Sequence, residues 1–425
     1  MALTESIETI DERPTCCTYA AGRVFYGMNN TVYYSQVIEG ESVDHLNKCH
    51  QMSDPTAEQL ADLLATDGGT IPINNAVNIK QIKAFGNGVL VYASNGVWYI
   101  SGPDTGFTAT NFFRKSVSKA GLASPQSVVT VEAEQYFWSR EGIYRISINQ
   151  TGQVEANSII EGTLQTFYND IPVAAREKVS GSYDRIKKQI EWFYASDTQT
   201  GATEYKYAHD LSIIYDVRTQ GIWPQQYNST LTEAAGDFVV GGVRTNLSTI
   251  AQEIAYLTIT TGTPSSTQTY SVDFAFKTDT DFQDFGTDYT TAFIEAGYET
   301  LDKPSNSKVA PYTYLHFKQT EENFVSDGLG GLKLDLQSGC QLQSQWDWND
   351  STANGRWGPS QQAYKFRRVY IPLAAGPFLS GETVVSTKLK VLGRGKALSL
   401  RFEQEAGKDM QLLGYTTVYS VKGRM

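Results

Sequence analysis

The chain has 425 residues and a formal net charge of −11, with 40% hydrophobic and only 19% charged residues. This composition excludes a disordered chain, and the length exceeds one ordinary hydrophobic core, so we expect two domains. The acidic balance excludes a general nucleic-acid binder, because the sequence shows no basic face.

The first half of the chain repeats one pattern: an alternating, aromatic strand, a turn and a second strand. The four pairs are 22–27 with 31–35, 88–93 with 96–101, 135–139 with 142–146, and 189–194 with 211–216. Repeated hairpins at intervals of roughly 45–65 residues predict propeller blades. Residues 1–15 precede them as an extended arm or a closing strand.

Short helices interrupt these hairpins. The clearest spans 54–66, where Asp54 caps the helix, Pro55 suits its first position and leucines form an apolar stripe. A second short helix is predicted at 162–169, followed by a helical turn at 174–176.

A Thr/Ser/Pro-rich stretch at 260–270 indicates a domain boundary. Beyond it, further alternating segments predict strands at 289–298, 309–319, 332–340, 364–373, 384–393, 396–404 and 411–421. Between them, 341–362 reads as a long loop or exposed hairpin. The fold class is therefore all-β. An irregular β-propeller with inserted short helices and an N-terminal arm occupies 1–265, and a β-sandwich-like platform occupies 266–425.

Metal-binding patterns are poor. His45 and His50 flank Cys49, but this spacing matches no common zinc motif, and the adjacent Cys16 and Cys17 have no CxxC partner. We interpret all four cysteines, including Cys340, as free thiols of a protein assembled in a reducing compartment. The acidic run 279–284 resembles a calcium loop, but Asp284 replaces its glycine and Thr290 its bidentate glutamate. We predict neither a metal nor a cofactor.

Catalytic patterns are equally weak. Asp184, Glu191 and Asp216 lie on or beside predicted strands, and a glycoside hydrolase would need two such carboxylates to converge. Glycine-rich spots at 328–331 and 393–395 lack the context of a phosphate loop and indicate turns. We predict no catalytic residue, no small-molecule substrate and no enzymatic activity.

Several basic residues cluster along the sequence. Arg185, Lys187 and Lys188 indicate a solvated hairpin turn, with contact to a phosphate backbone or an acidic neighbour as the alternative. Further basic positions that would suit salt bridges between subunits are Arg367, Arg368, Arg394, Lys396 and Arg401.

No apolar run is long enough to span a membrane, and the start MALTESIETI lacks the basic and apolar regions of a signal peptide. Because membrane and secretion signals are missing, we expect assembly in the cytoplasm.

The order of several segments resembles the tail nozzle, or tail hub, proteins of short-tailed bacteriophages, a group that includes packaged-DNA stabilisation proteins and tail tubular protein B. The matching stretches are 20–36, 53–71 with 87–102, 134–146, and the closing GRGKALSLRFEQEAGKDMQLLGYTTVYSVKGR at 393–424. Most of 147–392 carries no matching motif.

The resemblance implies a structural virion protein, located in the virion tail and assembled in the cytoplasm of the host bacterium. It implies a homo-hexameric ring below the portal and the adaptor protein, which extends the channel for double-stranded DNA without sequence specificity. It also implies docking of tail fibre, spike or needle proteins.

The alternative function is a propeller-type glycan-binding or glycan-cleaving tail component. Trp346, Trp348 and Trp357 are the candidate interface residues, because tryptophan is enriched where binding energy concentrates. Alternatively, these rings pack within their own sandwich.

Overall fold

The computed structural model describes residues 14–37, 64–103, 106–185, 187–195, 209, 211–226, 237–247, 252–261, 268–273, 283–284, 287–288, 292–321, 324–326, 332–334, 337–347, 357–365 and 383–422. The chain divides into two units, Met1–Asp273 and Phe274–Met425. The sequence places this boundary at 265–266 instead. The difference arises because β19 (Gln268–Asp273) pairs with β18 (Gln252–Thr261) and so stays with the first unit.

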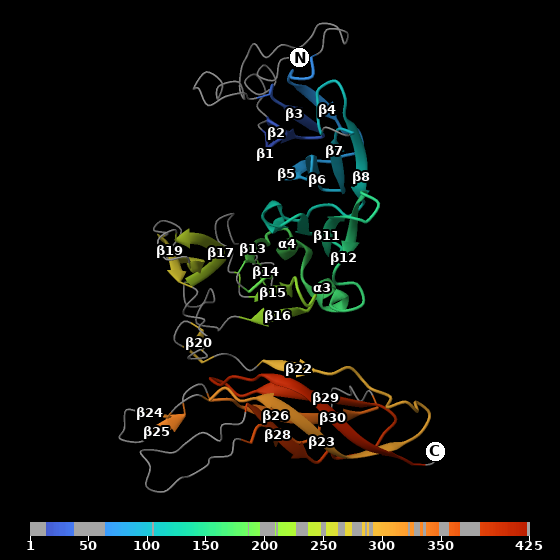
Figure 1. The fold of residues 1–425 in the computed structure, drawn as a ribbon, viewed down its shortest axis with the longest axis vertical. Coiled ribbons are helices and arrows are strands. Elements are labelled where there is room, and N and C mark those ends of the chain that lie inside the picture. Colours follow the sequence, from blue (N-terminus) through green and yellow to red (C-terminus); the bar gives the residue numbers. More distant parts are fainter. Residues whose placement is uncertain are drawn as a thin grey trace. The chain divides into compact units, whose positions relative to one another are not determined.

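The first unit contains four consecutive four-stranded antiparallel sheets, each joined as a simple meander (Figure 1). Their strands are β1 (Cys16–Ala20), β2 (Arg23–Met28), β3 (Thr31–Tyr34) and β4 (Gly69–Pro72); β5 (Ile79–Phe85), β6 (Gly88–Ala93), β7 (Gly96–Ser101) and β8 (Phe113–Ser118); β9 (Val129–Val131), β10 (Glu134–Trp138), β11 (Ile143–Ile148) and β12 (Val154–Ser158); and β13 (Ser180–Asp184), β14 (Gln189–Tyr194), β15 (Leu211–Asp216) and β16 (Ile222–Gln226). A three-stranded sheet of β17 (Asp237–Leu247), β18 and β19 follows them.

The four hairpins predicted from the sequence are confirmed, and each is the middle pair of strands of one sheet: β2–β3, β6–β7, β10–β11 and β14–β15. The middle strands of the second sheet are covered on both faces. Every residue of β6 and β7 is buried, which explains their unbroken apolar character.

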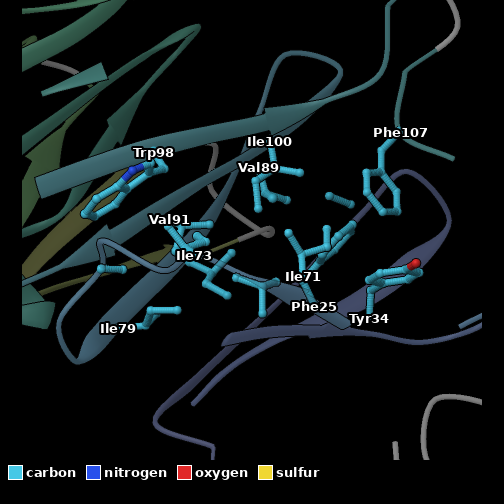
Figure 2. Packing of buried hydrophobic residues seen from close by; sticks show 14 of the residues in the cluster. Phe25, Tyr34, Ile71, Ile73, Ile79, Val89, Val91, Trp98, Ile100 and Phe107 are labelled. Carbon is cyan, nitrogen blue, oxygen red and sulfur yellow. The ribbon is translucent and has the colours of Figure 1, made fainter. Parts of the chain in front are cut away.

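Successive sheets pack face to face. Figure 2 shows the first such layer, where Phe25 and Ile71 of the first sheet meet Val91 and Ile100 of the second. A second layer joins the second and third sheets, and a third layer joins the third and fourth. The first strands of neighbouring sheets also lie side by side, β1 by β5 and β9 by β13. Stacked meanders with adjacent first strands are the arrangement of propeller blades, so the all-β, propeller-like fold class is confirmed.

Helical structure is brief in the described residues. A 3₁₀ turn, η3 (Pro125–Ser127), precedes β9, and α3 (Gln165–Asp170) and α4 (Val173–Arg176) connect the third sheet to the fourth. The helix predicted at 162–169 and the turn at 174–176 are confirmed, with small shifts. Of the helix predicted at 54–66, residues 54–63 lie outside the described residues, and 64–66 are not helical. None of the described helices is long and apolar enough to cross a membrane.

The second unit is built on a two-layer β-sandwich (Figure 1). One sheet has the order β22 (Phe293–Glu295), β29 (Leu398–Gln404), β26 (Cys340–Trp346), β27 (Gln361–Gln362), and the other has β28 (Val384–Leu389), β23 (Lys308–Lys318), β30 (Leu412–Val421). Side chains of both sheets, among them Leu315, Leu342 and Phe402, form its core. Two short pairs stand apart from these sheets, β20 (Gln283–Asp284) with β21 (Thr287–Asp288) and β24 (Phe324–Ser326) with β25 (Leu332–Leu334).

The sequence predicts a long loop or an exposed hairpin at 341–362. The two ends of this stretch do pair as a hairpin, Gln341 with Gln362 and Leu342 with Gln361, but β26 is an inner strand of the sandwich and is not exposed. Glutamines alternate along β26 and face outward, so the sequence does not reveal the apolar face formed by Cys340, Leu342 and Trp346. The strand predicted at 332–340 is shorter, since β25 ends at Leu334. Most of the one predicted at 364–373 lies outside the described residues.

Buried cations hold the irregular connections to these sheets. The Arg23 side chain, in a residue only 1% exposed, donates to the carbonyls of Ser35 and Asp67 at 2.6 and 2.5 Å and also to that of Ala65. Its guanidinium lies 5.4 Å from the ring centre of Tyr34. Arg23 therefore joins the two ends of the segment that connects β3 to β4.

Replacing Arg23 should destabilise the first unit. In Arg23→Met, three carbonyls lose their charged donor in a buried site, so we expect a loss of roughly 3 kcal/mol in the free energy of unfolding. Lys187→Met, at an exposed turn, is the control and should change it by less than about 0.5 kcal/mol. Urea unfolding measures both variants, and equal effects would show that Arg23 does not hold the connection.

Candidate interaction surface

Trp346 ends β26 and packs against its own sandwich core. Its indole Nε1 donates to the carbonyl of Leu392 at 3.0 Å. The ring lies over Gly393, where an added Cβ would come within 2.8 Å of it and where φ is +101°. Only glycine suits that position, so the predicted turn at Gly393–Gly395 is where the Trp346 ring packs. At Trp346, packing within the sandwich is the alternative that the structure adopts.

The residue after Trp346 closes the same junction. The Asp347 carboxylate accepts hydrogen bonds from the amides of Lys396 and Ala397, the latter at 3.1 Å. Beside it, the fully buried Lys308 ammonium donates to the carbonyls of Lys303, Asn306 and Lys396. Burial lowers the pKa of Lys308, and the charge of Asp347 opposes that shift. These contacts tie Trp346 and Asp347 to the segments around Lys308 and Lys396, a structural role.

Trp357 belongs to a different group of side chains, which we call the Arg401 cluster: Phe293, Trp357, Arg401 and Glu403. The Arg401 guanidinium lies 4.0 Å from the ring centre of Phe293 and 6.0 Å from that of Trp357. Glu403 is its ion-pair partner at 3.9 Å, and the Arg401 Nε has no hydrogen-bond partner. Phe293 is 53% exposed. Trp348 lies outside the described residues.

The Arg401 cluster combines an exposed ring with an arginine, the residue types that anchor protein interfaces. The sequence predicts contact roles for Arg401 and Trp357 but gives no signal for Phe293. Only the pairing of β22 with β29 brings Phe293 opposite Glu403.

A second candidate for assembly is the free edge formed by β30. This ten-residue strand pairs with β23 on one side and has no neighbour on the other within the described residues. Among edge strands of six or more residues in the described part of the chain, it alone has neither a charged residue nor a proline. Edge strands without such residues readily pair with another chain. Its uncharged run LLGYTTVYSV is the sequence signal that could have indicated such an edge.

The candidate acids share one face of the fourth sheet but make local contacts. Glu191 accepts a hydrogen bond from the Ser212 hydroxyl at 2.8 Å, and Asp184 accepts one from the Lys187 amide at 2.8 Å. Asp216 accepts hydrogen bonds from the amides of Arg218 and Thr219 at 2.9 and 3.0 Å, which closes the β15–β16 turn.

Burial by itself raises the pKa of Asp216, but these hydrogen bonds outweigh it and lower that pKa to about 2. In the basic turn, Lys188 lies 3.9 Å from Glu132, an acidic neighbour.

His45, Cys49, His50, Asp279, Asp281, Arg367 and Arg368 lie outside the described residues, and Asp284 belongs to the short strand β20. Within the part of the chain that the structure describes, no three His, Cys, Asp or Glu side chains gather as metal ligands would.

No known family profile and no curated protein matches this chain. Among solved structures it is similar to the N-terminal domain of Nup159 and to Nup159 in a complex of S. cerevisiae Dbp5, with TM-scores of 0.35 and 0.34, both at 11% identity over 60% of this chain. It is also similar to the extracellular domain of a one-component system of B. thetaiotaomicron, with a TM-score of 0.33 at 10% identity over 61% of this chain. The alignments span 59%, 59% and 28% of those chains.

The two described tryptophans should respond differently to substitution. Trp346→Phe removes the hydrogen bond to Leu392 and part of the core packing, so we expect it to cost about 1–2 kcal/mol in the free energy of unfolding. Trp357→Phe keeps a ring beside Arg401 and should cost less than about 0.5 kcal/mol. Chemical unfolding monitored by circular dichroism tests this, and a larger loss for Trp357→Phe would reverse the assignment.

Asp216 should make stability depend on pH. Because its folded-state pKa is about 2, below the ordinary value of 3.8, the ionised form stabilises the fold by roughly 2 kcal/mol at neutral pH. The unfolded state binds more protons as the pH falls through this range, so about half of the gain should be lost by pH 3. Unfolding of the wild type and Asp216→Asn at pH 7 and pH 3 measures this, and a pH-independent difference between them would contradict it.

Proposed function

We propose that this chain is a structural subunit of the tail nozzle of a short-tailed bacteriophage, which forms a homo-hexameric ring below the adaptor. The ring extends the channel through which double-stranded DNA is retained and released, and it docks tail fibre, spike or needle proteins. The protein acts in the virion tail after assembly in the bacterial cytoplasm, without catalysis, a cofactor or a small-molecule substrate.

The observation that carries this proposal is the free edge of β30. A ten-residue strand without charge or proline leaves a row of backbone donors and acceptors that another subunit can pair with. The inward residues Tyr415, Thr417 and Tyr419 are only half-buried, so an added strand would also cover apolar surface. The Arg401 cluster offers a second contact on the other sheet of the same sandwich.

The order of the matching segments gives the proposal its specific content. Three of them contain the middle hairpins β2–β3, β6–β7 and β10–β11, and the closing segment contains β29 and β30. The segments thus include middle strands of three of the four stacked sheets and the candidate edge.

Assembly is the first property to measure. We expect the purified chain, alone or mixed with its adaptor, to give six-fold rings with an open centre and a mass of about 280 kDa from subunits of 47.1 kDa, by light scattering and negative-stain imaging. Amides of β30 should become protected from hydrogen exchange on assembly, whereas those of the edge strand β8, which carries Arg114 and Lys115, should not.

A matched pair of variants tests the edge itself. Ser420→Glu puts a charge on β30 and should weaken the free energy of association by roughly 0.5–1 kcal/mol at each subunit contact. Ser116→Glu on β8 should leave the association and the rings unchanged. A chain that stays monomeric with its tail partners and binds or cleaves a glycan would overturn the proposal in favour of the alternative function.

A further inference from the structure

The outer face of the β28–β23–β30 sheet carries basic and aromatic side chains from separate parts of the chain. On β23, the outward residues are Tyr312, Tyr314, His316 and Lys318, since Thr313, Leu315 and Phe317 between them are buried. On and just after β28, Lys388 and Lys390 are exposed. Tyr312 and Tyr314 are 41% and 37% exposed.

Pairing of the strands brings these residues together. Tyr314 lies opposite Lys388, and His316 lies opposite Ser386, with a hydrogen bond of 2.9 Å between their Nδ1 and Oγ atoms. The Lys388 ammonium lies 3.9 Å from the ring centre of Tyr312 and 5.5 Å from that of Tyr314. The aromatic rings thus hold one cation at the centre of the face.

This face has no acidic residue at any outward position of its three strands. On β30 the outward residues are Thr416, Val418 and Ser420, and on β28 they are Val384, Ser386 and Lys388. The described acids that lie closest to these strands along the chain have other partners. Asp409, before β30, accepts a hydrogen bond from Gln411 at 2.8 Å, Asp302 accepts one from Tyr419 at 3.1 Å, and Glu321, after β23, accepts one from Tyr364 at 2.6 Å. Glu322 and Glu382 lie outside the described residues.

A cationic surface of this kind is unexpected on a chain with a net charge of −11. Three lysines on a face without outward acids complement a polyanion. They are spread over up to roughly 20 Å along the strands, a length that meets several phosphates of a duplex. The Lys388 ammonium over the Tyr312 ring occupies a ring face on which an unpaired base would stack. The chemistry favours contact with a phosphate backbone, independent of sequence.

We propose that the outer face of the β28–β23–β30 sheet, through Lys318, Lys388 and Lys390, binds the backbone of double-stranded DNA weakly and without sequence specificity. The inference deepens the proposed function by naming a surface that contacts the DNA, and it rests on that function for the identity of the polyanion.

Duplex binding by the full-length chain tests this inference separately from ring assembly. Fluorescence anisotropy with a labelled duplex of arbitrary sequence should give a dissociation constant in the range of roughly 10⁻⁶–10⁻⁴ M. With about three phosphate contacts, the slope of log affinity against log salt should be about −2.7, so binding should weaken roughly 40-fold between 50 and 200 mM salt.

Two triple variants with equal charge change separate this face from bulk electrostatics. Replacing Lys318, Lys388 and Lys390 with Gln should weaken duplex binding strongly and flatten the salt slope. Replacing Arg185, Lys187 and Lys188 with Gln at the exposed β13–β14 turn should leave both unchanged. Lys388→Arg, which keeps the charge, should retain binding, and circular dichroism confirms that each variant is folded.

Four outcomes would overturn the inference: no duplex binding by the wild type at 50 mM salt, equal losses in the two triple variants, tighter binding of single-stranded DNA, or tighter binding of dextran sulfate than of the duplex. Each leaves the assembly result unchanged, because ring formation is measured without DNA. Failure to form rings would in turn leave the duplex titration interpretable.

Discussion

The structure depends first on burial of both faces of the middle strands. A four-stranded meander can be covered on both sides only by other sheets, so each blade needs a neighbour, and the core of the first unit is divided into successive layers. β6 and β7 show the consequence most clearly, since all their residues are buried between two layers. Removing one layer would expose the aromatic faces of two sheets at once.

The same constraint decides what the sequence reveals. The fully covered strands β6 and β7 are nearly continuous apolar runs, and the hairpin pattern located them along with the other middle strands. Edge strands such as β8, with Arg114 and Lys115, or β16, with Pro224, carry weaker patterns because only part of their surface is buried. In the sandwich, the sequence of β26 does not reveal an inner strand, because its outward face carries glutamines and only its inward face is apolar.

Long-range polar contacts lie beyond any local pattern. Arg23, Arg176 and Lys308 are buried cations, and each collects carbonyls from an irregular segment that would otherwise leave them without hydrogen bonds. Nothing in the neighbouring sequence distinguishes them from solvated basic residues. The candidate surfaces follow the same rule, since Phe293 meets Arg401 through strand pairing and Tyr312 meets Lys388 across two strands.

Net charge is therefore a poor guide to what one face of this protein contacts. The sequence shows clustered basic residues at Arg185, Lys187 and Lys188, yet that turn has an acidic partner in Glu132. On the β28–β23–β30 face, Lys318 is about 70 residues from Lys388 and Lys390 in sequence, and no acid lies among the outward residues of that sheet. In a channel, an acidic surround would repel DNA and a small cationic face would hold it weakly, a balance that favours retention without stalling passage.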